Sequence, residues 1–272
     1  MRKFHLLNRH IAAVMENEWS QLMRSKIIIF TTLAPPVLLV GVALSVLLLS
    51  ALIDADSSQV NRAASTLSGN AEMLALLNNG DAMRASLLTP FLLLFQMIPL
   101  VVPITIGSYS IVGEKQSRSL EALLATPIRT WELLAGKALA AALPGILATW
   151  YAFAIFALAA RFAVSDEINR YLIFGPTWML SILVLTPLFT LLAVGIAIII
   201  SSRVRDPQSA QQLGSLVILP VIGALVAQVT GLVNVGVGVV LGTALVIGLL
   251  DVALLALAVR LFRRETILTT WR

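Results

Sequence analysis

The sequence predicts an all-α integral membrane protein with six transmembrane helices and an amphipathic interfacial helix before them. Of the 272 residues, 58% are hydrophobic and only 12% are charged, and the mean hydropathy is +0.93. A chain of this composition is too apolar for a soluble domain. Long uncharged segments alternate with short charged ones along the whole sequence. We therefore expect residues 1–272 to form a single transmembrane domain with both termini in the cytoplasm.

The first predicted element is an amphipathic helix over about residues 8–25, of the elbow type that lies in the membrane interface. Its apolar stripe consists of Ile11, Val14, Met15, Trp19, Leu22 and Met23. Glu18 falls at the edge of this stripe. Either it contacts a basic residue of the cytoplasmic loop, or its carboxylate extends to water, and we favour the second interpretation.

Six apolar segments follow, each long enough to cross a hydrocarbon core about 30 Å thick. They cover about residues 27–53, 86–113, 138–160, 171–202, 210–229 and 236–260. Pro99 and Pro103 predict a kink in the second span. Gly231 and Asn234 predict the turn between the last two spans, because one helix over that whole region would be far longer than the membrane is thick.

The basic residues predict the orientation of the spans. Fifteen of the 19 Lys and Arg residues fall before span one, between spans two and three, between spans four and five, or after span six. By the positive-inside rule these segments face the cytoplasm, and the protein is a multi-pass protein of the cell membrane, inner or plasma. Because this distribution accounts for the net charge of +5, no nucleic acid is expected as a partner.

A charged segment, Glu114–Lys137, separates spans two and three and predicts a helix, a sharp turn and a second helix. The first helix, over about residues 114–126, has an apolar and a polar face. The apolar face contains Leu120, Leu123 and Leu124, and the polar face contains Glu114, Arg118 and Glu121. Pro127 ends this helix, and Thr130 is a suitable N-cap for the next one. The polar face can contact a cytoplasmic partner.

Four segments resemble the ABC-2-type permeases, the membrane subunits of type V ABC exporters. The most specific is the charged segment, which ends in TPIRTWELLAGK, and the others are ENEWSQLMRSK, SSRVRDPQSAQQLGSLVILP and LFRRETILTTWR. The resemblance implies an elbow helix, six spans, and a coupling helix between spans two and three that contacts a separate ATP-binding subunit. The residues that it places at contacts with this subunit are Glu114, Arg118, Ser119, Glu121 and Leu124, and, in a second and smaller contact, Arg205 and Asp206.

The implied transporter contains two copies of an ABC ATPase subunit and a second permease, identical or related, in contact with membrane lipid. The resemblance is compatible with an accessory subunit but does not require one. ATP and Mg²⁺ are expected in the ATPase subunit, because this chain has no GxxxxGK[ST] motif. No catalytic residue, cofactor or metal site is expected in the chain itself, which contains no Cys and two His.

Three polar residues inside the predicted spans are candidates for the translocation path or for helix packing. Asp251 is the ionisable residue deepest in a span, and it either has a function or is hydrogen-bonded to a neighbouring helix. Gln96 and Gln228 either line the path or hold helices together. Gly238 and Gly242 form a GxxxG motif, which we interpret as a site of helix packing within the chain rather than between two copies.

The leading hypothesis is a permease that forms the path of an ATP-driven exporter. One alternative is an ion-coupled secondary transporter in which Asp251 carries the coupling, although the chain shows no inverted repeat. Another is a membrane anchor that couples to a cytoplasmic ATPase without transport. The largely uncharged interior suggests an amphiphilic or lipid-like cargo, and the sequence names no substrate.

Overall fold

The structure, a computed structural model, describes residues 2–52, 79–116, 130–204 and 206–261, and in these ranges it contains helices and no strand. The α-helices are α1 (Arg2–Arg24), α2 (Lys26–Leu52), α5 (Asn79–Leu88), α6 (Phe91–Phe95), α7 (Ile98–Gln116), α9 (Thr130–Ala163), α10 (Asp166–Ile168), α11 (Pro176–Leu180), α12 (Thr186–Arg203), α13 (Pro207–Ser215), α14 (Leu219–Val229) and α15 (Val237–Leu261). Two π-helical turns, η1 (Asn169–Ile173) and η2 (Ser181–Leu185), and one 3-10 turn, η3 (Leu216–Ile218), lie between them.

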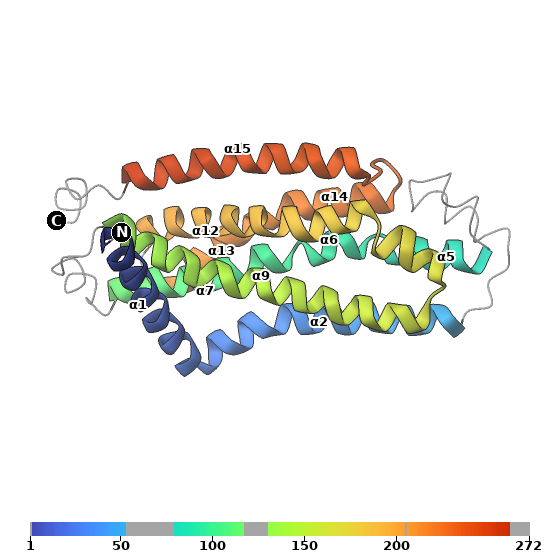
Figure 1. The fold of residues 1–272 in the computed structure, drawn as a ribbon, viewed down its shortest axis with the longest axis horizontal. Coiled ribbons are helices and arrows are strands. Elements are labelled where there is room, and N and C mark those ends of the chain that lie inside the picture. Colours follow the sequence, from blue (N-terminus) through green and yellow to red (C-terminus); the bar gives the residue numbers. More distant parts are fainter. Residues whose placement is uncertain (1, 53–78, 117–129, 205, 262–272) are drawn as a thin grey trace.

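Six helical segments of the described residues are long and apolar enough to cross a membrane. They are Ile29–Leu49, Arg84–Ser110, Ala135–Ala163, Pro176–Arg203, Pro207–Val229 and Val237–Leu257. Figure 1 shows them lying roughly parallel in one elongated bundle, with α1 oblique across the end where the chain begins. The predicted all-α fold with six spans is confirmed.

The second span is interrupted, as its prolines predict. Gln96 and Met97 form a turn between α6 and α7, and Pro99 follows in the first turn of α7. Pro103 lies inside α7. Because proline has no N–H to donate and its ring crowds the preceding turn, two prolines so close together favour a break at this level of the span.

The fourth span begins at Pro176, five residues later than the sequence suggests. Gly175 is extended (φ −67°, ψ 160°), and Pro176 occupies the first position of α11. A proline is tolerated there because the first N–H groups of a helix have no intrahelical acceptor. Within this span the π-helical turn η2 separates α11 from α12, and Pro187 follows it at the start of α12. The widened turn accommodates a proline that an uninterrupted α-helix would not.

α7 is the central helix and packs against α12, α9, α13 and α2. Three glycines allow the closest approaches, and the Cβ atom added at one of them, Gly214 of α13, would lie 2.7 Å from Cγ2 of Ile104 in α7. A Cβ atom at Gly145 of α9 would lie 2.6 Å from Cγ of Pro103, and one at Gly107 of α7 would lie 2.9 Å from Cβ of Ala197. Neighbouring backbones therefore approach α7 more closely than any residue with a side chain would permit.

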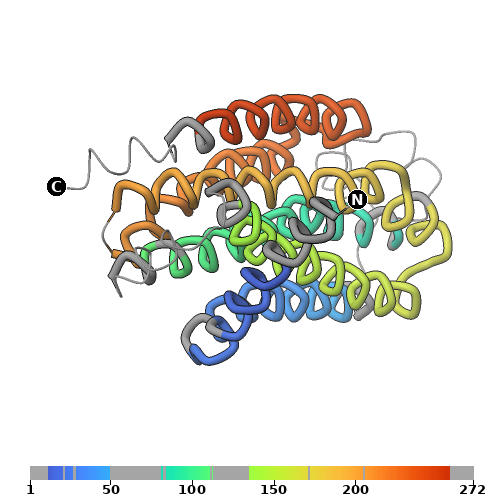
Figure 2. Tube along the Cα trace, turned by 60° about the vertical axis from the view of Figure 1, so that its left-hand side comes forward, coloured from blue at the N-terminus to red at the C-terminus, as the bar shows by residue number. Residues whose placement is uncertain are grey.

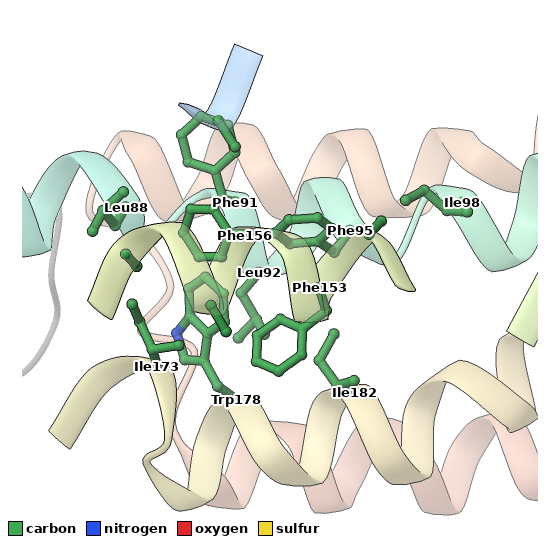
Figure 3. Close-up of a cluster of buried hydrophobic side chains, with 14 of the residues drawn as sticks. Leu88, Phe91, Leu92, Phe95, Ile98, Phe153, Phe156, Ile173, Trp178 and Ile182 are labelled. Atoms are coloured by element: carbon green, nitrogen blue, oxygen red, sulfur yellow. The ribbon is translucent and has the colours of Figure 1, made fainter. Parts of the chain in front are cut away.

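Aromatic side chains fill the core between spans two, three and four. The rings of Phe156 and Trp178 stack with centroids 5.8 Å apart, and Phe95 contacts both. Figure 3 shows Phe91, Phe95, Phe153, Phe156 and Trp178 converging from three helices. This cluster fixes the relative positions of the three spans at one level.

α2 and α15 lie at opposite edges of the bundle, as Figures 1 and 2 show. Their outer faces are apolar and exposed; Phe30 of α2 is 73% exposed and Val252 of α15 is 68% exposed. Helices that are apolar on all sides are expected where lipid or a second membrane protein covers the outer face. Gly238 and Gly242 have no atom within 4 Å of an added Cβ among the described residues. Our interpretation of this GxxxG motif as a packing site within the chain is wrong, because α15 presents it to open space.

The turn that joins α14 to α15 is the one predicted at Gly231. The residue has φ 74°, a backbone conformation that favours glycine. Its N–H donates to the carbonyl oxygen of Gln228 (3.0 Å), and the N–H of Leu232 donates to that of Ala227 (2.8 Å). This is the Schellman arrangement, which satisfies the last carbonyls of a helix and reverses the chain.

Candidate functional site

A buried polar triad joins three helices at the end of the bundle where the chain begins. Its members are Glu18 of α1, Ser110 of α7 and Lys137 of α9, and we call them the Glu18 triad. The Glu18 and Lys137 side chains form an ion pair. The Ser110 hydroxyl donates to Oε2 of Glu18 (2.6 Å) and accepts from Nζ of Lys137 (3.0 Å). Each member therefore contacts the other two.

Burial makes this triad an energetic constraint on the three helices. Glu18 is 3% exposed and Lys137 is 6% exposed. Two charges removed from water at such a site are tolerated only as a hydrogen-bonded pair. The interpretation of Glu18 as a carboxylate extending to water is therefore wrong, and its alternative, a contact with a basic residue of the charged segment, is correct.

α1 is fixed to α9 by a further contact beside the triad. The indole Nε1 of Trp19 donates to the carbonyl oxygen of Ala140 (3.1 Å). Val14, one turn before Glu18, is also buried. The face of α1 that carries Val14 and Glu18 thus lies on α9, as their spacing of four residues requires. Displacement of α9 at this level would carry α1 with it.

A second polar site lies where the second and fourth spans are both irregular. Nε2 of Gln96 donates to the backbone carbonyl oxygen of Ser181 (2.8 Å), and Nε1 of Trp150 donates to that of Ile182 (3.0 Å). Both acceptors belong to the π-helical turn η2. The carbonyl oxygen of Ser181 also accepts from the N–H of Thr186 within the helix, so the side-chain donor uses its second lone pair. This π-turn site joins spans two, three and four.

A cavity of about 540 Å³ adjoins the π-turn site and lies between spans two, four, five and six. Gln96, Ser181 and Thr243 are its polar lining residues, and the other lining residues are apolar. Gln96 thus holds two spans together, which is one of the two roles that the sequence left open, and it also lines this cavity.

Gln228 is buried and Asp251 is half-buried, and both have buried side-chain oxygens that make no hydrogen bond in the described part of the chain. Both carboxylate oxygens of Asp251 and Oε1 of Gln228 are in this state. Asp251 lies in α15, three residues before Leu254, which packs on Gly195 of α12. Hydrogen bonding of Asp251 to a neighbouring helix, the alternative considered from the sequence, is thus absent among the described residues.

Most of the expected ATPase contacts lie outside the described residues. These are Arg118, Ser119, Glu121, Leu124 and Arg205, together with most of the coupling helix expected over residues 114–126. Glu114 lies in the last turn of α7. Asp206 is exposed and is the N-cap of α13, where its side chain accepts a hydrogen bond from the N–H of Ser209 (2.8 Å). That bond lowers the pKa of Asp206 below its usual value.

Ser110 and Lys137 were not identified as site residues from the sequence. Ser110 carries no signal that separates it from other small polar residues in a span. Lys137 does, because it stands directly before the uncharged run of the third span, where a buried cation needs a partner. A carboxylate within the apolar stripe of α1 is the complementary signal, and the two together would have predicted the ion pair.

Residues 12–239 match the sequence model of the family described as ABC-2 family transporter protein. The match covers most of the chain. The chain belongs to the ABC-2 transporter family. The comparison with curated proteins found no match.

As an ABC-2 permease, the chain is a membrane component of an ABC transporter and a multi-pass protein of the cell membrane. Permeases of this family have no ATPase domain of their own and work with an ABC ATPase subunit. The Glu18 triad and the π-turn site therefore belong to the membrane component of the transporter. They do not belong to the part that binds nucleotide.

Proposed function

We propose that this permease forms half of the translocation path of an ATP-driven exporter. A second permease, identical or related, supplies the other half, and two ATPase subunits that bind ATP and Mg²⁺ contact the cytoplasmic end of the bundle. Family membership supports the role as a permease. The arrangement of α1, α7 and α9 supports the route by which motion enters the bundle.

The observation that carries this proposal is the Glu18 triad. α7 ends at Gln116 and α9 begins at Thr130, so the two helices flank the segment expected to contact the ATPase. Ser110 and Lys137 lie near these two helix ends and are joined through Glu18 of α1. A push on the segment between α7 and α9 would reach three helices as one unit, because the buried charges resist separation.

The end of the bundle that holds the triad is assigned to the cytoplasm. α1 begins there, α7 and α12 end there, and α9 begins there (Figure 1). Most of the Lys and Arg residues belong to the segments at these helix ends, as the positive-inside rule requires. The start of α13 at Asp206 lies at the same end and would form the second, smaller contact with the ATPase.

Co-purification tests the proposal. The tagged permease is extracted from its native membrane in a mild detergent, and an associated subunit with a Walker A motif is sought by mass spectrometry. We expect the ATPase to accompany the wild type and to be lost with Glu121→Arg. If the wild type brings no ATPase in several mild detergents, the proposal is wrong.

The coupling role of the triad needs a separate readout. We expect the double variant Glu18→Leu/Lys137→Met, which leaves no unpaired buried charge, to retain ATPase binding, because both residues are buried and cannot contact another subunit directly. Substrate-stimulated ATP hydrolysis should be lost in this variant. Glu16→Gln, which changes an exposed carboxylate of the same α1 helix, is the matched control and should behave as wild type.

One observation favours a second candidate, an ion-coupled transporter. Asp251 is a carboxyl group within a span, and its two buried oxygens make no hydrogen bond in the described part of the chain. Such a residue could bind and release a proton or cation. Transport by reconstituted permease that follows a proton gradient without any ATPase, and that disappears with Asp251→Asn, would support this candidate in place of the exporter.

A further inference from the structure

We propose that the cavity beside the π-turn site binds an uncharged, largely hydrocarbon molecule through one hydrogen bond from its hydroxyl or other neutral donor to Oε1 of Gln96. The proposal deepens the exporter function by naming a substrate class. It rests on that function for transport alone, because binding needs neither the ATPase nor a second permease.

The orientation of the Gln96 amide follows from its partner. The atom of Ser181 that Gln96 contacts is a backbone carbonyl oxygen, which can only accept a hydrogen bond. The amide nitrogen must therefore face Ser181, and the amide oxygen is left over. That oxygen is buried and has no hydrogen-bond partner in the described part of the chain, while Gln96 as a whole is 1% exposed and lines the cavity.

The residues around the cavity select against charge. All of its lining residues are described, and none of them is ionisable. An ion transferred here from water would lose its hydration without gaining a counter-ion. A neutral donor would instead satisfy an acceptor that otherwise stays unpaired. A hydroxyl group on a hydrocarbon body fits both requirements.

The size and depth of the cavity fit such a molecule. Its volume of about 540 Å³ falls within the range of about 300–1,000 Å³ that is usual for small-molecule sites. Gln96 lies near the middle of the second span, Arg84–Ser110, so the bonded donor sits deep in the membrane with apolar walls from α12, α14 and α15 around it.

Photolabelling tests the proposal with a diazirine-bearing hexadecanol as the probe. The permease is purified in phosphatidylcholine nanodiscs without an ATPase, and labelled peptides are mapped by mass spectrometry. Unlabelled hexadecanol and hexadecane then compete for the site, since they differ only in the hydroxyl group. We expect labels on α14 and α15. Hexadecanol should compete about 3- to 20-fold better than hexadecane, the range that one hydrogen bond within a membrane protein provides.

Variants assign the site. Gln96→Leu should make hexadecanol and hexadecane equal competitors. Ala224→Phe, which fills the cavity from α14, should reduce labelling strongly. Val226→Phe, on the same helix but exposed and outside the lining, is the matched control and should label as wild type does. Because the side chain of Ala224 is a methyl group that makes no polar contact, this pair keeps the test valid if Gln96→Leu fails to fold.

Two results would overturn the proposal. Equal competition by the alcohol and the alkane in the wild type would mean that the cavity holds only lipid acyl chains. Equal labelling of Ala224→Phe and Val226→Phe would place the probe elsewhere. If either result appears while the wild type co-purifies with an ATPase, this proposal is wrong and the exporter function stands. Specific labelling without any ATPase partner would do the reverse.

Discussion

Nε2 of Gln96 donates a hydrogen bond of 2.8 Å to the carbonyl oxygen of Ser181, which ties the break in the second span to the π-helical turn of the fourth. Both spans are irregular at this level, and the bond joins their irregular parts directly. Two spans that are irregular at the same depth in the bundle can bend together, because the hydrogen bond between them is kept as both move.

The first prediction compares the loss of the Gln96 side chain with the loss of the Ser181 hydroxyl group. Gln96→Leu should lower the free energy of unfolding by about 1–2 kcal/mol, the upper range for a hydrogen bond between membrane helices. Ser181→Ala should have little effect, because the acceptor is the backbone carbonyl oxygen. Thermal unfolding in detergent measures both. Equal losses in the two variants would mean that the hydrogen bond is not the cause.

The second prediction concerns the buried charges of the Glu18 triad. Lys137→Met should destabilise the protein by about 3–5 kcal/mol, because it leaves the carboxylate of Glu18 buried without its cation. The double variant Glu18→Leu/Lys137→Met removes both charges and should recover most of that loss. Denaturant unfolding of the single and double variants gives the coupling energy. Simple additivity of the two substitutions would contradict the buried pair.

A third prediction follows from the close approach of α9 to α7. Gly145→Ala should cost about 1–3 kcal/mol, because the new methyl group would meet the ring of Pro103, which is held in a helix. Gly223→Ala in α14 is the control, since an added Cβ there has no atom within 4 Å. The difference between the two melting temperatures is the measurement. A harmless substitution at Gly145 would show that α7 and α9 can separate freely.

The fourth prediction is a dependence on pH at the start of α13. The N–H of Ser209 lowers the pKa of Asp206 in the folded protein, so the cap contributes its full stabilisation above the unfolded pKa, about 4. The contribution is lost as the pH falls from there through the lower folded pKa. Asp206→Asn keeps a capping side chain that does not titrate. The protection factor of the Ser209 amide, which is the exchange rate of an unfolded peptide divided by that of this amide at the same pH, should therefore fall in acid for the wild type and stay level in the variant.

The fold was largely predictable because membrane spans are read from composition. The uncharged runs predict six crossings, and the turn at Gly231 follows because a single helix over spans five and six would greatly exceed the membrane thickness. Pro99 and Pro103 predict the interruption of the second span. These features depend on local sequence alone, so one sequence is enough to predict them.

The contacts between helices were less predictable because they depend on how the helices are rotated. The partner of Glu18 is set by the angle at which α1 crosses α9, and the residues of either helix taken alone do not determine that angle. The orientation of the Gln96 amide depends on a widened turn in another span. Gly238 and Gly242 matched a packing motif, yet α15 turns them outward, since the motif does not say which face its helix buries.

The tight turn at Gly231 has a consequence for how the chain enters the membrane during synthesis. Residues 230–236 carry no charge, and the Schellman bonds close the turn within the chain itself. α14 and α15 can therefore insert together as a helical hairpin, which needs no charged loop to be carried across the bilayer. Asp251 would cross as part of this pair, so the favourable transfer of two apolar helices offsets the cost of one carboxyl group.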